Sequence, residues 1–303
     1  MDTKQIEYIL KIAEENNITK AAEKLFITQS ALNQQLLKLE KELGTPLFHR
    51  SRTNWRLTEA GEIYIEGAKA ALQIKNTTYN RIYDVVSARN GHLTIGLTPG
   101  RGLRMFTAIY PELHRSFPNL DVRPIEMRVR AQQDAIAKGD IDVGLMTLTQ
   151  KDQTSDTYYP LKQEELVVII PAGHPLAEKA APSGEPLATL DLTELRYEPF
   201  VLMDKTSTLR SSCDLLFEKA GFAPNILFET NNTSGIAAMV QSTLCCGIIP
   251  RYYTLGLTEG VACFSLPERP SWEIVISCQK NGYLNSGARE FIRLAREYWE
   301  NSV

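Results

Sequence analysis

Cysteine and histidine are scarce in this chain, and neither forms a pattern that would bind a metal ion. The 303 residues include four histidines, which occur singly, and five cysteines. The cysteines are Cys213, Cys245, Cys246, Cys263 and Cys278. They form an odd set without metal-ligand spacing, so we expect no metal centre, no cofactor and a reducing compartment. We interpret the adjacent pair at 245–246 as buried packing rather than a redox sensor, because vicinal disulfides are strained and uncommon.

Long apolar runs are also missing, and we expect no secretory leader. The segment 166–170 is among the longer apolar runs, far below the roughly 20 residues that a membrane-spanning helix requires. Residues 1–4 read MDTK, without the basic and apolar pattern of a signal peptide. A hydrophobic content of 43% and a charged content of 23% are typical of globular proteins. We therefore expect a cytoplasmic protein with no membrane partner.

The chain lacks an overall positive charge and the common catalytic motifs. Its net charge is −3, so any DNA binding must come from a local patch of cations. No G-x-S-x-G elbow, H-E-x-x-H motif or Walker lysine motif is present. The run from Gly96 to Gly102 superficially suggests a phosphate loop, but it lacks the spacing and the lysine. We therefore expect no catalytic residues.

Residues 18–58 carry the pattern of a helix-turn-helix. Thr19 and Thr28 stand where helix N-caps are needed, and Gly44 is placed to end the second helix. The apolar stripe of the second helix consists of Leu32, Leu36, Leu39 and Leu43. Its polar face consists of Gln29, Ser30, Asn33, Gln34 and Lys38. These donors and acceptors, with one cation, suit base edges and phosphates.

An arginine-rich hairpin is predicted directly after this helix. Residues 47–58 contain Arg50, Arg52 and Arg56, with Thr53-Asn54 at the expected tip. Such a wing can reach phosphates or the minor groove beside a recognition helix. The helix alone could be an ordinary amphipathic helix with a solvated face, but the order of helix and wing favours DNA binding. The expected contacts are Thr28, Gln29, Ser30, Asn33, Gln34, Lys38, Arg50 and Arg52.

The same segment resembles the DNA-binding domain of the LysR-type transcriptional regulators. The resemblance rests on Ala21-Ala22, Thr28-Gln29-Ser30-Ala31-Leu32, Leu39-Glu40, Leu43-Gly44, Pro46-Leu47-Phe48, Arg50 and Leu57-Thr58-Glu59-Ala60-Gly61. This chain has Ser30 where the family usually has proline, and Asn33 where it usually has serine. Both positions lie near the DNA in the family, so the target sequence does not carry over from relatives.

Thr58 is the expected N-cap of a long helix from residue 59 to about residue 88. Its apolar stripe consists of Ala60, Ile63, Tyr64, Gly67, Ala71, Ile74, Ile82 and Val85. Thirty residues would reach roughly 45 Å, and antiparallel pairing with a second subunit would bury the stripe. Packing within the same chain is the alternative. The resemblance implies a linker and dimerisation helix, so we expect a homodimer or homotetramer.

The pattern changes after residue 90, where short strands alternate with helices. Strands are expected at 92–97, 121–127, 141–146, 165–171, 200–203, 226–229, 247–249 and 272–278. The intervening pattern favours parallel βαβ units and an α/β class. Two lobes are expected, and the chain is expected to pass from one to the other near Pro160 and again near Pro267. This is the organisation of the periplasmic-binding-protein-like domains of the regulator family. We assign 1–58 to DNA binding, 59–90 to the linker and 91–303 to effector binding, with lobe I at about 91–162 and 268–303 and lobe II at about 163–267.

A ligand in such lobes lies at the carboxyl ends of the strands, against helix N-termini. By family position, the expected effector contacts are Thr98, Pro99, Arg128, Thr147, Leu202, Thr206, Ser207 and Asn231. Any one of these hydroxyl residues could serve only as a helix N-cap. Because all of them are expected to lie at one cleft, we favour a role in binding the effector. Arg101, Arg128, Arg130 and Lys205 follow strand ends, which favours a small anionic effector such as a carboxylate.

The main hypothesis is therefore a transcriptional regulator that binds double-stranded promoter DNA under the control of an effector. An enzyme and a solute-binding transport protein are the alternatives. An enzyme would need turnover that survives deletion of residues 1–90, and the winged-helix pattern speaks against a transport protein. RNA polymerase is a further candidate partner.

Overall fold

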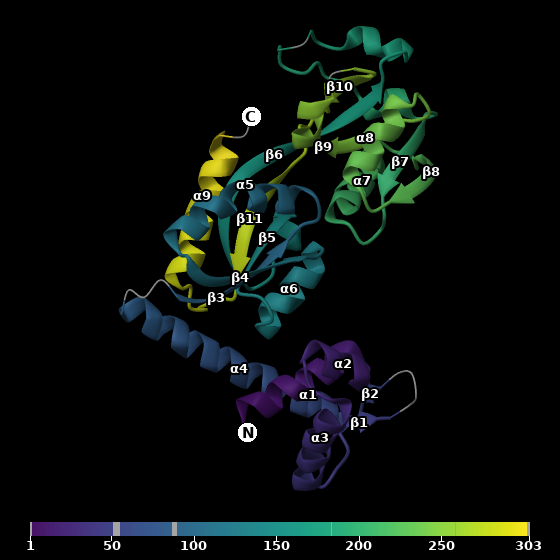
Figure 1. Cartoon of the computed structure of the whole chain (residues 1–303). Coiled ribbons are helices and arrows are strands. Elements are labelled where there is room, and N and C mark those ends of the chain that lie inside the picture. Colours follow the sequence, from purple (N-terminus) through teal and green to yellow (C-terminus); the bar gives the residue numbers. More distant parts are fainter. Residues whose placement is uncertain (1, 51–54, 87–89, 183, 258, 302–303) are drawn as a thin grey trace. The chain divides into compact units, whose positions relative to one another are not determined.

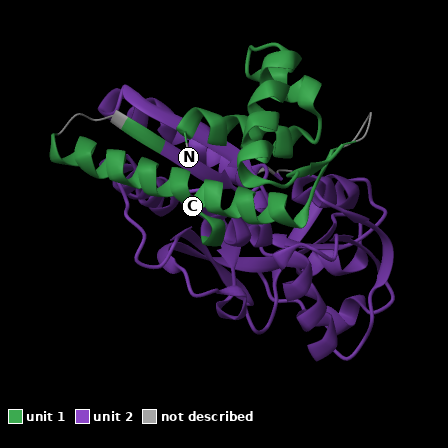
Figure 2. Ribbon diagram, turned by 90° about the horizontal axis from the view of Figure 1, so that it is seen from below, with its two compact units in different colours: residues 1–92, 137–140 green, residues 93–136, 141–303 purple. Residues whose placement is uncertain are grey.

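The computed structural model describes residues 2–50, 55–86, 90–182, 184–257 and 259–301. It forms two compact units (Figure 2). Unit 1 comprises residues 1–92 with 137–140, and unit 2 comprises residues 93–136 with 141–303. The expected wing tip and Arg52 lie outside the described residues.

Unit 1 contains a helical domain with a two-stranded wing and one long helix (Figure 1). Its elements are α1 (Thr3–Glu15), α2 (Ile18–Lys24), α3 (Gln29–Leu43), β1 (Phe48–His49), β2 (Arg56–Leu57) and α4 (Glu59–Val85). The strands β1 and β2 pair antiparallel. The first three helices and the start of α4 share one apolar core, centred on Ile9, Ile12, Leu32 and Leu36. This arrangement is the winged helix-turn-helix that the sequence predicts.

Three of the four predicted caps in unit 1 are present. Thr28 accepts a hydrogen bond from the backbone N–H of Ala31 at 3.1 Å, and Thr58 caps α4 in the same way. Gly44 ends α3 with a φ of 72°. The predicted cap at Thr19 is wrong, because α2 begins at Ile18 and its cap lies two residues before Thr19. Asn17 is the cap there, and its side chain accepts from the backbone N–H groups of Thr19 and Lys20.

The buried stripe of α3 is shorter than the sequence predicts, and the stripe of α4 is largely exposed within this single chain. The stripe of α3 ends at Leu39, since Leu43 is 45% exposed. Helix α4 has 27 residues, which corresponds to roughly 40 Å, and its described part ends before the expected residue 88. Within this chain, Ile63 and Ile74 are 68% and 69% exposed, and Val85 is 86% exposed. Most of the helix therefore presents an uncovered apolar side.

Unit 2 is a mixed α/β structure. Its first elements are β3 (Asn90–Leu97), α5 (Arg101–Ser116), β4 (Asn119–Glu126), α6 (Val129–Lys138), β5 (Val143–Leu148), η1 (Gln150–Asp152) and β6 (Thr157–Pro171). The chain continues with η2 (Pro175–Lys179), η3 (Leu192–Leu195), β7 (Pro199–Met203), α7 (Thr208–Lys219), β8 (Asn225–Thr230) and α8 (Thr233–Gln241). It closes with β9 (Gly247–Pro250), η4 (Arg251–Gly256), β10 (Val261–Ser265), β11 (Ser271–Cys278) and α9 (Ser286–Asn301).

The strand β6 runs through both lobes (Figure 1). Its first half, up to Glu165, pairs antiparallel with β11, and its second half pairs with β9 and β10. The strand predicted at 165–171 is therefore the second half of a longer strand. Pro160 lies inside β6 beside a register shift in β11, where a missing N–H is tolerated.

We call the elements around the first half of β6 lobe I, and those around its second half lobe II. Lobe I comprises β3, α5, β4, α6, β5, β11 and α9, and lobe II comprises β7, α7, β8, α8, β9, η4 and β10. In lobe I, β3 and β5 are parallel and are packed between α5 with α9 on one face and α6 on the other. In lobe II, β7 and β8 are parallel, whereas β9 and β10 run antiparallel to β6. The predicted parallel strand pairs are therefore present in both lobes together with antiparallel strands, and β10 was not predicted.

Candidate functional site

The polar face of α3 is exposed, as expected of a recognition helix. Leu32, Leu36 and Leu39 are buried against α1 and α2. The opposite side carries the exposed residues Thr28, Gln29, Ser30, Gln34 and Lys38, with Asn33 half-buried. The buried stripe fixes the helix from behind, so the first turns of α3 are open to a partner.

Arg50 lies against α3, which the sequence does not reveal. Glu40 is 8% exposed, and its carboxylate forms an ion pair with Arg50 and accepts the backbone N–H of Leu47 at 2.8 Å. The guanidinium carbon of Arg50 is 5.5 Å from the ring centre of Trp55. Arg50 and Glu40 therefore tie the wing to the recognition helix. Sequence reasoning placed Arg50 only at the DNA.

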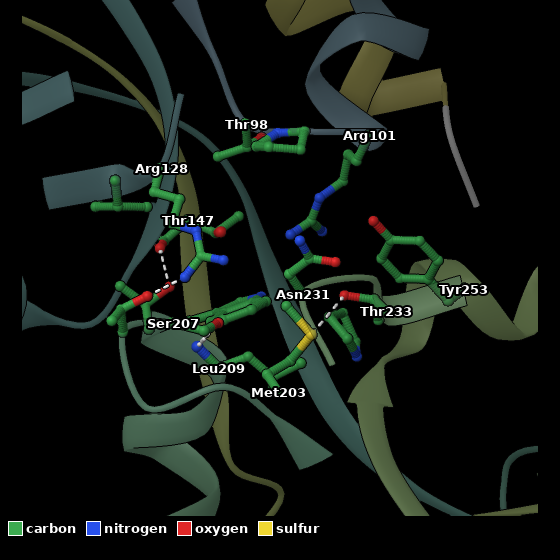
Figure 3. Close-up of a pocket in the computed structure, with 16 residues that line it drawn as sticks. Thr98, Arg101, Arg128, Thr147, Met203, Ser207, Leu209, Asn231, Thr233 and Tyr253 are labelled. Atoms are coloured by element: carbon green, nitrogen blue, oxygen red, sulfur yellow. Dashed lines mark hydrogen bonds between the residues drawn. The ribbon is translucent and has the colours of Figure 1, made fainter. Parts of the chain in front are cut away.

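A cavity of about 100 Å³ lies in unit 2 between the two lobes (Figure 3). Lobe I contributes residues at the ends of β3, β4 and β5, and lobe II contributes the starts of α7 and α8. The lining is Thr98, Pro99, Arg101, Arg128, Val129, Thr147, Met203, Thr206, Ser207, Thr208, Leu209, Asn231, Thr233, Pro250, Tyr253 and Trp272. Seven of the eight expected effector contacts are in this set.

Leu202 is the exception. It is 0% exposed and lies in the core of lobe II, beside Phe200. Successive residues of a strand face opposite sides, so Met203 reaches the cavity in its place. Tyr253, Thr233 and Trp272 were also missed, since they come from η4, α8 and β11 and have no local sequence signal.

Several cavity hydroxyls already have structural partners. Ser207 caps α7 by accepting from the backbone N–H of Leu209 at 3.2 Å, and Thr208 donates across the cleft to the carbonyl oxygen of Thr147 at 3.1 Å. Thr98 differs, because its Oγ1 is buried and has no hydrogen-bond partner among the described residues. Such a group is costly to bury unless a partner completes it.

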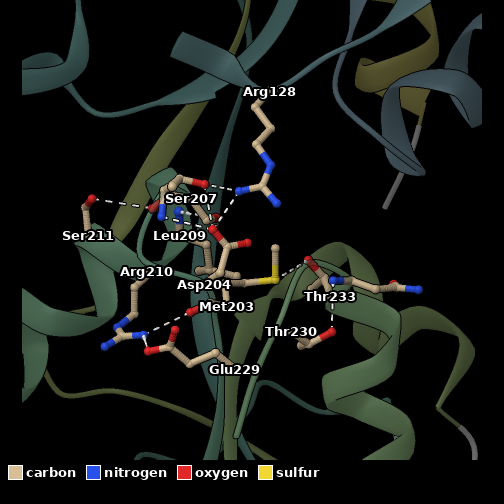
Figure 4. Close-up of polar contacts among 12 residues, drawn as sticks. Arg128, Met203, Asp204, Ser207, Leu209, Arg210, Ser211, Glu229, Thr230 and Thr233 are labelled. Atoms are coloured by element: carbon tan, nitrogen blue, oxygen red, sulfur yellow. Dashed lines mark hydrogen bonds and ion pairs between the residues drawn. The ribbon is translucent and has the colours of Figure 1, made fainter. Parts of the chain in front are cut away.

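Arg128 crosses the cleft and pairs with Asp204 (Figure 4). Its Nη1 lies 2.6 Å from Asp204 Oδ1, and the same nitrogen contacts Thr206 Oγ1. The hydrogen bond from Arg128 holds the pKa of Asp204 well below its usual range. The same hydrogen bond raises the pKa of Arg128.

Arg101 forms a second pair, at the back of the cavity. Arg101 and Glu164 are 5% and 6% exposed and form an ion pair. Glu164 also accepts from the indole N–H of Trp272 at 2.7 Å and from the backbone N–H of Tyr252 at 3.2 Å. The guanidinium carbon lies within 6 Å of four ring centres. Both carboxylate oxygens of Glu164 therefore have partners within the protein. Arg101 is held in place by these contacts and still lines the cavity.

Both the N-terminal and the C-terminal part of the chain match known protein families. Residues 3–62 match the family model described as bacterial regulatory helix-turn-helix protein, lysR family. Residues 87–300 match the LysR substrate binding domain. An uncharacterised HTH-type regulator of Bacillus subtilis, YcgK, is 29% identical, with 98% of this chain and 94% of the relative covered. The Hca operon transcriptional activator HcaR of Escherichia coli is 26% identical, with 98% of each covered.

Solved structures share the fold over the full length. A full-length OxyR variant from Pseudomonas aeruginosa superposes with a TM-score of 0.70 at 21% identity, covering 100% of this chain and 99% of that one. Full-length CbnR in complex with its target DNA gives a TM-score of 0.66 at 20% identity, covering 98% and 100%. Among the described residues, no helix is long and apolar enough to cross a membrane, and no cluster of His, Cys, Asp or Glu could hold a metal ion. The chain belongs to the LysR family of DNA-binding transcriptional regulators, which act without catalysis, and it carries the family's substrate-binding domain.

Proposed function

We propose that a small carboxylate, bound in the cavity of unit 2, controls how this regulator binds DNA. The observation that carries the proposal is the charge distribution around the cavity. Arg101 and Arg128 both line it, whereas no Asp or Glu does among the described residues. Their partners, Glu164 and Asp204, meet them from outside the lining, so both guanidinium groups remain turned toward a ligand (Figure 3).

The polar groups around these arginines complete a carboxylate site. Thr98 offers a buried hydroxyl that needs a partner, and Ser207 is the N-cap of α7, whose N-terminal dipole favours an anion. The proposed contacts are Thr98, Pro99, Arg128, Thr147, Thr206, Ser207 and Asn231, together with Arg101, Thr233 and Tyr253.

Thermal unfolding of the full chain with small carboxylates, each paired with its own amide, tests the ligand class. A carboxylate at about 100 times its Kd should stabilise the protein by about 2.7 kcal/mol, and the amide should not. The Arg128→Gln variant should lose most of this shift. Equal shifts for acid and amide, or a full shift in the variant, would reject the carboxylate.

We propose that α3 reads base edges through Gln29, Ser30, Asn33 and Gln34. Thr28, Lys38, Arg50 and Arg52 would contact the phosphate backbone. Replacing Gln29 with Ala should cost roughly 1–3 kcal/mol on the preferred site and relax the preference at one base pair. Footprinting on DNA upstream of the protein's own gene, with a scrambled control, measures this. Equal loss on both DNAs would remove Gln29 from base reading.

We further propose a homodimer or homotetramer in the cytoplasm, with α4 as the pairing helix. The support is the uncovered side of α4, which includes Ile63, Ile74 and Val85. The effector must bind one arrangement of the subunits more tightly than another, because a ligand without that preference shifts no equilibrium. RNA polymerase is proposed as a promoter-bound partner from the family resemblance alone.

A further inference from the structure

Polar contacts made by Arg128 and Thr147 join the two lobes across the cavity, and Arg101 of lobe I also lies against the rings of Tyr252 and Tyr253 of lobe II. Arg128, between β4 and α6, belongs to lobe I, whereas Asp204 and Thr206, between β7 and α7, belong to lobe II. Arg128 binds both of them, and Thr208 of lobe II donates to Thr147 of lobe I. Each of these contacts uses a side chain and none is a backbone pairing between strands, so they can separate without breaking the sheet.

Asp204 is fixed within its own lobe before it meets Arg128. Its Oδ1 accepts from the backbone N–H of Thr206 at 3.0 Å and from Thr206 Oγ1 at 2.6 Å. The carboxylate is therefore oriented by the turn that leads into α7. Arg128 is the more exposed partner, at 43% against 26% for Asp204, and it reaches over from the other lobe (Figure 4).

A second arginine network in lobe II provides a contrast. Arg210 is 6% exposed and binds Asp214, Glu229 and the carbonyl oxygen of Met203, all within that lobe. Such a network holds β7, β8 and α7 together but cannot affect the distance between lobes. The Arg128–Asp204 pair instead joins the two lobes, and its position suits a contact that opens and closes.

We propose that Arg128 and Asp204 form a latch that keeps the cleft closed when no effector is bound. The proposal rests on the function proposed for this cavity. An arginine has five N–H donors, so Arg128 can hold Asp204 through Nη1 and a ligand carboxylate through its other nitrogens. The latch must open for a ligand to enter and can close again over it. The effector then reinforces an arrangement that one ion pair already favours.

Hydrogen exchange of the ligand-free, full-length protein, followed by mass spectrometry, tests the latch. The readout is the amide exchange of residues 127–132 in lobe I and 204–211 in lobe II. The Asp204→Asn variant should speed exchange in 127–132 by about twofold to fivefold, as expected when a partly exposed ion pair is lost. Arg128→Gln should speed exchange in 204–211 by a similar factor. High salt should reduce the difference from wild type.

The matched control is Glu229→Gln, which removes an ion-pair partner of Arg210 inside lobe II. It should leave 127–132 unchanged. The reversed pair, Arg128→Asp with Asp204→Arg, should recover protection in both segments. If Asp204→Asn alters only 204–211, Asp204 merely organises its own turn and the latch is overturned. Because no ligand is added, a carboxylate panel that fails would leave this result unaffected.

Discussion

Phe26 adopts a backbone conformation that is unfavourable for its side chain. It follows α2 with a φ of 55°, and its ring is 96% exposed. The neighbouring N–H of Ile27 closes the helix end on the carbonyl oxygen of Ala22, which requires this left-handed turn. Glycine is the usual residue at such a position, because it has no Cβ to clash.

Phe26→Gly should therefore stabilise the protein by about 0.5–1 kcal/mol. Thermal unfolding of the full chain measures the change. Phe26→Ala is the control, since it removes the ring but keeps the Cβ, and it should give little gain. A lower melting temperature for the glycine variant would show that the exposed ring contributes to folding.

The cysteine thiols should be unreactive in the native protein. All five are free, and burial raises the pKa of each, to about 12 for Cys213 and Cys246. The reactive thiolate is therefore scarce near neutral pH. Iodoacetamide at pH 8, with mass spectrometry, should label the native chain far more slowly than the urea-unfolded chain. Rapid native labelling of Cys245 or Cys246 would reopen the case for redox sensing.

At the scale of secondary structure, helix α4 carries several exposed apolar side chains on one side. Ile74→Glu would place a charge on that side and should weaken self-association by at least tenfold, because an unpaired charge would be buried in the interface. Sedimentation velocity over a concentration series measures this. Asn76→Glu is the control, because Asn76 lies two residues further along α4 and points to the opposite side of the helix. This variant should associate like wild type. Unchanged association of the Ile74 variant would assign pairing to another surface.

The helices and caps were predictable because their signals are local. Thr28 and Gly44 bound α3 within one run of sequence, and strand ends such as Thr98 stand next to their strands. Asn17 was missed because Thr19 satisfies the same cap rule two residues later. Whether the side chain of Leu202 points into the cavity or into the core depends on how its strand pairs with its neighbours, and the sequence of one strand does not show this. Pairs such as Arg128 with Asp204 join distant segments, so only the folded chain brings them together.

At the scale of the whole molecule, the cross-cleft pair should be insensitive to pH in the physiological range. Arg128 lowers the pKa of Asp204 below its ordinary value, about 3.9 when unfolded. The contribution of such a carboxylate is complete above the unfolded pKa and is lost only as pH falls through the folded pKa. Arg128 and Thr206, which bind Asp204, do not titrate there.

Exchange protection of residues 127–132, corrected for intrinsic rates, should therefore be constant from pH 5 to 8 and should fall with added salt. Glu229→Gln should show the same profile as wild type in this segment. A marked loss of protection between pH 7 and 5 would mean that another group controls the cleft.

The continuous strand β6 makes lobe II an insertion within lobe I. The chain enters lobe II after Glu165 and returns at Ser271, and these two residues are register partners in the antiparallel pair of β6 and β11. Their ends are therefore close enough for a tight hairpin turn to join them. Lobe II could be removed or exchanged there without cutting the remaining sheet. Ligand preference encoded in α7 and α8 can then be transplanted separately from the lobe that carries Thr98 and Arg128.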